Sequence, residues 1–301
     1  MARRYKPGRS YDLFGIYSWY TPGIGGLLLF ALMFLLGIVL ASIVGIGLQM
    51  AGMEGDSFNL IVYVTMFIPV MIYSAVVSRN NALWDKGYKI DNNSHFAPYG
   101  GFVMAVMAVI AMICTGLAID PVNNLIAENI PMSDMMKEAL EGLVGGNFIL
   151  NFLSVCVFAP LFEEWMCRGV ILRSLLLKIR PVWAVIISAL VFALIHGNIW
   201  QGVNAFALGL LLGYVYYKTG SLKLTILMHF TNNFISLLLS QSSAMSQYES
   251  WADVMPSWAY WTAVGASAII LVGTIAVFRK VPVEGRLNCD EISAEEFSAG
   301  N

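Results

Sequence analysis

The chain has 301 residues, of which 58% are apolar (AVILMFWYC) and only 12% are charged. Soluble globular proteins carry about 25% charged residues, so a globule of this size could not keep so much apolar surface away from water. A formal net charge of −2 and the lack of any Cys-x-x-Cys pair exclude a basic nucleic-acid-binding surface, a disulfide-stapled secreted domain and a thiolate metal site. The composition therefore predicts an all-α protein whose helices cross a membrane several times.

Eight apolar stretches meet or approach the roughly 20 residues that a helix needs to cross a bilayer. They are 24–50, 59–77, 100–119, 147–170, 182–198, 202–218, 222–240 and 258–278. The first is too long for the apolar region of a cleaved signal peptide, so we expect it to stay as a span. We expect one membrane-embedded helical domain over 1–280, followed by a polar and flexible tail over 281–301.

The basic residues support this number of spans. Lys and Arg accumulate in the cytoplasmic loops of membrane proteins. With eight spans and a cytoplasmic N-terminus, every Lys and Arg except Lys137 and Arg168 falls on the cytoplasmic side. A wrong count would scramble this segregation. The sequence therefore predicts a multi-pass protein of a plasma or inner membrane with both termini in the cytoplasm.

The longest outer loop is expected at 120–146. Within it, 133–143 carries apolar residues at helical spacing, and Ser133 is placed to cap the start of a helix. This pattern predicts an amphipathic helix on the membrane surface.

Three of the expected spans carry polar residues in otherwise apolar sequence. An ionisable residue inside a span costs about 2.5–3.5 kcal/mol on insertion scales, and it marks a functional site by default. Pairs four residues apart share one helix face. The residues in question are Glu163, Glu164 and Arg168 in the fourth span, Phe192 and His196 in the fifth, and His229 and Asn233 in the seventh. If the three faces converge, they form one polar pocket within the bilayer.

Pro160 precedes the paired glutamates by three residues. A proline removes a backbone donor and leaves a carbonyl of the preceding turn without its partner. A membrane helix tolerates such a carbonyl beside a polar cavity but not facing lipid. We therefore expect the fourth span to be bent or loosened next to Glu163.

Hydrolysis of a peptide bond needs a base for the water, a group that orients the water and donors for the oxyanion. Glu163 is the candidate base, and His196 can hold the same water or share its proton. His229 and Asn233, one helical turn apart, can both face a developing oxyanion. These four residues are the candidate catalytic groups.

A metal ion is the alternative within the same chemistry. Glu163, His196 and His229 would match a catalytic zinc ion with one open position, although the sequence has no His-Glu-x-x-His motif. Asn is a poor zinc ligand but a good oxyanion donor. The leading interpretation therefore requires no cofactor, with zinc or another divalent metal as the alternative.

These residues together resemble three motifs of the CPBP family, also called Abi proteins or type II CAAX prenyl endopeptidases. The motif EExxxR matches Glu163, Glu164 and Arg168, the motif FxxxH matches Phe192 and His196, and the motif HxxxN matches His229 and Asn233. The resemblance covers about residues 145–240. It implies an intramembrane endopeptidase in which Glu163 and His196 activate water, and His229 and Asn233 stabilise the oxyanion. Glu164, Arg168 and Phe192 are then supporting residues.

The resemblance further implies that the substrate is a membrane-associated protein or peptide, held in the lipid bilayer. Nothing in the chain indicates a prenylated substrate or an oligomeric state. A non-catalytic binding protein, for example one that gives self-immunity to a bacteriocin, is the first alternative. An ion-coupled transporter is the second, although the sequence shows neither repeats nor paired broken helices.

Overall fold

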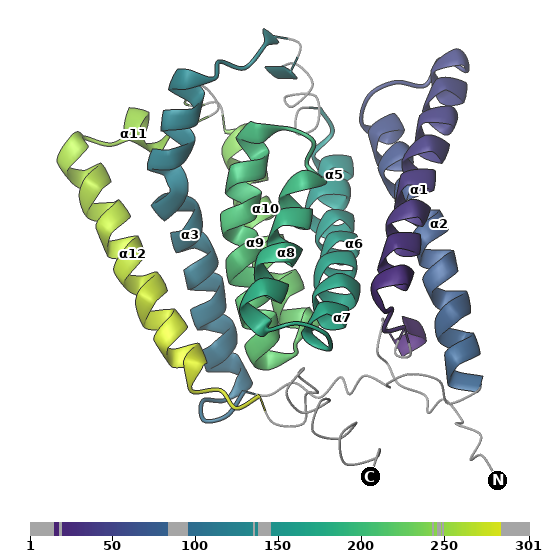
Figure 1. Cartoon of the computed structure of the whole chain (residues 1–301). Helices are drawn as coiled ribbons and strands as arrows, with labels where there is room; N and C mark the ends of the chain where they lie inside the picture. The colour runs from purple at the N-terminus through teal and green to yellow at the C-terminus, as the bar shows by residue number, and fades with distance from the viewer. Residues whose placement is uncertain are drawn as a thin grey trace, which may run out of the picture. The chain divides into compact units, whose positions relative to one another are not determined.

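The computed structural model describes residues 15–17, 20–83, 96–134, 136–137, 146–242, 244–245, 248 and 250–283. Within those residues all regular secondary structure is helical, which confirms the predicted fold class. The chain divides into two compact units, Met1–Asn92 and Asn93–Asn301, and Figure 1 shows the helices of each. The predicted catalytic core, 145–240, lies in the second unit.

The first unit is a hairpin of α1 (Ile24–Met50) and α2 (Asp56–Leu83), preceded by the single turn η1 (Gly15–Tyr17). A Cβ atom at Gly37 of α1 would overlap the carbonyl oxygen of Met66 in α2. Glycine at this position therefore lets the two helices pack backbone against backbone, as small residues do between membrane helices.

The second unit holds the remaining helices. Its long helices are α3 (Gly101–Asn129), α9 (Ile199–Thr219), α10 (Leu222–Gln241) and α12 (Ser257–Arg279), and its shorter ones are α8 (Pro181–Leu194) and α11 (Trp251–Val254). Between α3 and α8 the chain is helical from Phe148 to Leu176. In Figure 1, α12 lies beside α3, and α8 lies beside α9.

The helix from Phe148 to Leu176 changes its winding along its length. Its segments are α5 (Phe148–Asn151), η2 (Phe152–Phe158), α6 (Ala159–Glu164), η3 (Trp165–Leu172) and α7 (Arg173–Leu176). The segments η2 and η3 have the wide turns of a π-helix, in which an N–H bonds the carbonyl five residues earlier. Sequence predicted a loosened helix near Pro160, and the structure shows wide turns on both sides of the paired glutamates.

The core of the second unit lies between α3, α9, α10 and α12. Its side chains are almost completely shielded, and they include Met104, Ala108, Met112, Leu208, Leu212, Val215, Met228 and Phe278. This packing fixes α10, which carries two of the candidate catalytic residues, against α3 and α9.

The described residues include seven helices that are long and apolar enough to cross a membrane. The predicted span 24–50 coincides with α1, while α3 runs beyond the predicted 100–119 to Asn129. The fifth predicted span, 182–198, differs most. There α8 has only 14 residues and ends at Leu194, so its length is about 21 Å against a hydrocarbon core of about 30 Å.

The early end of α8 corrects the position of His196. This residue lies in a turn between α8 and α9, not in a membrane helix, and the turn is closed by Gly197 with a φ of 70°. A positive φ is a conformation that glycine adopts readily and that ends a helix. The predicted span extends to 198 because 182–198 is apolar on average, although His196, Gly197 and Asn198 interrupt the apolar residues directly after Ile195.

Two further predictions fall partly outside the described residues. At 133–143 the backbone N–H of Met136 donates to Ser133 Oγ over 3.3 Å, as an N-cap requires, but 138–145 lie outside the described part. Of the predicted tail 281–301, only 281–283 are described. The cytoplasmic placement of both termini stays a prediction.

Candidate active site

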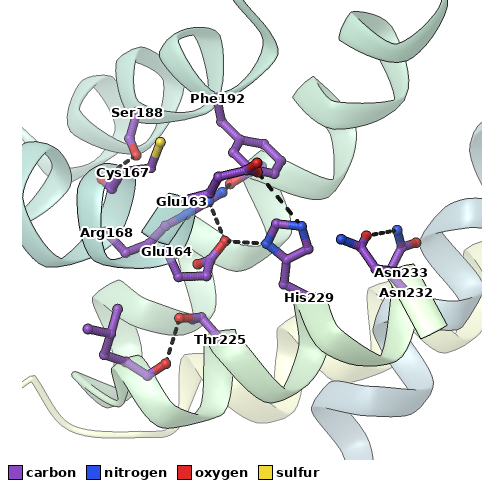
Figure 2. Close-up of polar contacts among 12 residues, drawn as sticks. Glu163, Glu164, Cys167, Arg168, Ser188, Phe192, Thr225, His229, Asn232 and Asn233 are labelled. Carbon is purple, nitrogen blue, oxygen red and sulfur yellow. Dashed lines mark hydrogen bonds and ion pairs between the residues drawn. The ribbon is translucent and has the colours of Figure 1, made fainter. Parts of the chain in front are cut away.

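The polar residues singled out in the sequence come from three segments of the second unit. Glu163 and Glu164 end α6, and Arg168 follows in η3. Phe192 lies in the last turn of α8, with His196 just after it, and His229 and Asn233 lie on α10. Figure 2 shows the side chains of Glu163, Glu164, Arg168, Phe192 and His229 gathered at one place between these segments.

A buried ion pair forms the base of this cluster. Arg168 Nη1 donates to Glu164 Oε1 over 2.7 Å, and both side chains are fully buried. Arg168 Nη2 donates to the carbonyl oxygen of Gly209 on α9 over 3.0 Å. Burial of either charge alone would be strongly unfavourable, so each stabilises the other within the membrane.

Glycine at position 209 allows the Arg168 side chain and α8 to lie close to the backbone of α9. A Cβ atom there would lie 3.1 Å from Ala189 Cα and 3.3 Å from Phe192 Cδ1, so a larger residue would push α8 away from α9. Gly209 was not among the residues predicted from the sequence. Its one sequence signal is the spacing of Gly209 and Gly213, one turn apart on the same face of α9.

His229 is oriented by the second glutamate. Its Nδ1 lies 3.1 Å from Glu164 Oε1, which also accepts from Arg168. Because an ionised carboxylate can only accept a hydrogen bond, Nδ1 carries the proton and donates it to Glu164. The other ring nitrogen, Nε2, then faces Glu163, with 3.9 Å between Nε2 and Glu163 Oε2.

The side chains of Glu163 and Glu164 differ in how far they are exposed. The Glu163 side chain is 12% exposed, whereas that of Glu164 is completely buried. The separation of 3.9 Å from His229 Nε2 exceeds a hydrogen bond, but a single water oxygen can contact both atoms at that spacing. Of the two carboxylates, Glu163 is therefore the one placed to act on a water molecule.

Phe192 packs against three of the charged or titratable groups. The Arg168 guanidinium lies 4.5 Å from the centre of its ring. The rings of His196 and His229 meet it edge to face, with centroids 5.1 Å and 5.3 Å away. A cation over an aromatic face and edge-to-face ring pairs are both attractive arrangements, so Phe192 helps to hold all three in place.

His196 is held by the end of α8. Its Nδ1 lies 2.7 Å from the carbonyl oxygen of Phe192, to which only an N–H can donate. This contact leaves Nε2 of His196 as the ring atom that is available for chemistry. The sequence-predicted pairing of Phe192 and His196 is thus a direct contact, although His196 lies beyond the helix.

Asn233 makes two contacts through its side-chain amide. Its Nδ2 donates to the carbonyl oxygen of Val155 over 2.8 Å, and its Oδ1 accepts from Asn232 Nδ2 over 3.2 Å. Val155 lies in η2, upstream of the paired glutamates. The sequence predicted that Asn233 faces the reacting groups, and it gave no sign of this backbone partner.

A metal ion held by Glu163, His196 and His229 was the alternative interpretation of this cluster. Within the described residues, no group of three or more His, Cys, Asp or Glu side chains lies close enough together to hold a metal ion. His229 Nδ1 and His196 Nδ1 are both occupied by hydrogen bonds to the protein. Each ring keeps Nε2 as a possible ligand atom, but the described residues do not bring Glu163, His196 and His229 together as the three-ligand set of a catalytic zinc site.

Residues 145–235 match the family model of type II CAAX prenyl endopeptidases, described as Rce1-like. This match confirms the predicted resemblance over the segment that carries all three motifs. No curated protein and no solved structure matches the chain. The match and the apolar helices together support an integral, multi-pass membrane protein with an endopeptidase segment of the CAAX-protease type.

Proposed function

Because residues 145–235 match the Rce1-like endopeptidases, we propose that this protein hydrolyses peptide bonds of membrane-associated proteins or peptides within the bilayer. The observation that carries the proposal is the pairing of two unlike glutamates around His229. Glu164 is buried against Arg168 and orients the imidazole, while the partly exposed Glu163 faces the other side of the same ring.

In the proposed reaction Glu163 is the general base. It accepts a proton from a water molecule as the water oxygen attacks the scissile carbonyl carbon, and the proton passes on to the leaving amine. His196, through its remaining Nε2, is proposed to hold the same water. Peptide hydrolysis consumes one water molecule and needs no further reactant.

His229 is proposed to face the developing oxyanion through Nε2. Because Nδ1 already carries a proton, Nε2 donates to the oxyanion only in the doubly protonated, cationic ring, whereas in the neutral ring its lone pair accepts a proton from the water. Both roles require the ring orientation that Glu164 holds from Nδ1. The sequence-based role of Asn233 as a second oxyanion donor stays a prediction.

No step of this proposal passes through a metal ion. We expect cleavage by the purified protein to survive a chelator that crosses membranes, because Glu163 and His229 suffice to activate water. Cleavage that is lost on chelation and regained with zinc would instead support a metal bound by Glu163, His196 and His229.

The proposal is tested in membranes from cells that make equal amounts of wild-type protein, Glu163→Gln or Glu128→Gln. Glu128 is an exposed carboxylate on α3 and serves as the matched control. Protein termini and peptide fragments are compared by mass spectrometry. We expect fragments that are present with the wild type and Glu128→Gln and absent with Glu163→Gln. Unchanged fragments, together with a retained cellular phenotype, would favour the binding or immunity protein instead.

A further inference from the structure

The carbonyl of Val155 cannot receive a regular backbone hydrogen bond. The N–H of Ala159, which an α-helix would direct to Val155, donates to Ser154 in the π-helical register. In that register the donor for Val155 would be residue 160, and Pro160 has no N–H. The wide turn and the proline therefore act together to leave this oxygen without a backbone donor.

Asn233 supplies the donor that is missing. Its Nδ2 lies 2.8 Å from the Val155 oxygen, across the interface between α10 and η2. A carbonyl without a partner inside a membrane is costly, so this hydrogen bond ties the two helices together. Sequence predicted that Pro160 frees a carbonyl, and the structure identifies both that carbonyl and its partner.

This contact lies beside the candidate catalytic cluster. Asn233 follows His229 by one turn of α10, and Val155 precedes Glu163 on the same continuous helix. The two helices are thus joined twice, by Asn233 with Val155 and by His229 with the paired glutamates. A shift of the helix at Val155 would change the distance between Glu163 and His229.

We propose that Asn233 is a positioning residue, which holds the Val155 carbonyl and so sets the placement of Glu163 against His229. This inference deepens the proposed function. The expected effect of Asn233 on cleavage rests on that function, whereas the hydrogen bond to Val155 does not. Positioning differs from an oxyanion role, because Asn233 then acts through the backbone of the helix and not by contact with the substrate.

Pro160 allows the two roles to be separated. In the double variant Asn233→Ala with Pro160→Ala, the new N–H at residue 160 can donate to Val155 in the existing π-register. If Asn233 acts by positioning, this variant regains what Asn233→Ala alone loses. If Asn233 donates to the oxyanion, a backbone N–H at residue 160 cannot replace it. Pro69→Ala, in α2, is the matched second substitution that should restore nothing.

The hydrogen bond can be observed without a substrate. Val155–Cys156 is the only Val–Cys pair in the sequence, so carbonyl-13C valine with 15N cysteine gives one doubly labelled peptide group. We expect its carbonyl resonance to move with Asn233→Ala and to move back in the double variant with Pro160→Ala. Ser236→Ala, whose hydroxyl donates to its own helix at Asn232, should leave it in place.

The placement of His229 against Glu163 can be followed by NMR of the histidine ring nitrogens. In 15N-histidine protein, which has three histidines, the ring nitrogens of His229 should shift with Asn233→Ala and return when Pro160→Ala is added. Cleavage of the Glu163-dependent fragments should fall about tenfold with Asn233→Ala and recover in the double variant.

Three results would overturn the inference. The first is a Val155 carbonyl resonance that does not shift with Asn233→Ala, and the second is a set of His229 ring signals that do not shift with it. The third is a double variant that cleaves as little as Asn233→Ala alone. If no Glu163-dependent cleavage exists, the proposed function fails, and the Val155 and His229 signals still decide whether Asn233 positions the cluster.

Discussion

The buried carboxylate of Glu164 contacts both Arg168 and His229, so it joins the packing of the helix to the proposed chemistry. Glu164 Oε1 accepts from Arg168 and from His229, so the charge that orients the imidazole is itself neutralised by the arginine. Removal of only one member of such an ion pair is costly, because the other charge is then buried without a partner. Removal of both charges avoids that cost.

We therefore expect Arg168→Met to lower the free energy of unfolding by about 3–5 kcal/mol. The double variant Glu164→Gln with Arg168→Met should recover most of this loss, since glutamine is neutral and still accepts from His229 Nδ1. The free energy of unfolding of the single and the double variant is measured in mixed detergent micelles. A double variant as unstable as Arg168→Met alone would show that the loss comes from packing of the arginine side chain and not from its charge.

The sequence singled out Glu163, Glu164, Arg168 and His229 because ionisable side chains are rare within apolar helices, and the structure brings these four side chains together. It could not assign the partner of Asn233. That partner is a backbone oxygen, and its availability depends on the π-helical register of the preceding helix. An apolar sequence does not distinguish that register from an α-helical one.

At the scale of elements, the close approach of α8 and α9 brings Phe192 and the Arg168 acceptor to the site. The helices approach at Gly209, where a Cβ atom would lie within 3.1 Å of Ala189. The positions of most helices could be predicted from hydropathy. Hydropathy over 182–198 placed the end of α8 too late, because an average over such a stretch does not register that His196 and Gly197 interrupt it.

Gly209→Ala tests this packing. We expect it to lower the free energy of unfolding by about 1–3 kcal/mol, because the added methyl group must displace α8. Gly265→Ala in α12 is the matched control, since no atom lies within 4 Å of its added Cβ, and it should not lower stability, because alanine is favoured over glycine by about 0.5–1 kcal/mol inside a helix. Equal effects of the two substitutions would mean that the α8–α9 contact is not tight.

At the scale of the whole molecule, the short helix α8 decides how the chain crosses the membrane. Seven described helices are long enough to span it, and α8 has 14 residues. If α8 enters the membrane and α9 returns from it, the N- and C-termini lie on the same side. The segregation of basic residues predicts this arrangement, because Arg180 before α8 and Lys218 at the end of α9 then both lie in the cytoplasm.

Reporter fusions after Asn301 test the orientation. A fluorescent protein that matures only in the cytoplasm should be bright there, and a phosphatase that is active only outside the cytoplasm should be inactive. The opposite pair of results would place the C-terminus outside, as an odd number of crossings from a cytoplasmic N-terminus requires.

The proposed peptide hydrolysis depends most directly on activation of water by Glu163. Purified wild-type protein and Glu163→Gln, each in lipid vesicles, are incubated in 18O-labelled water with peptides prepared from the membrane proteome, and new C-termini are identified by mass spectrometry. We predict a defined set of new C-termini that carry 18O with the wild type and are missing with Glu163→Gln. The same set with both proteins, or no new C-termini with either, would contradict the proposed role of Glu163.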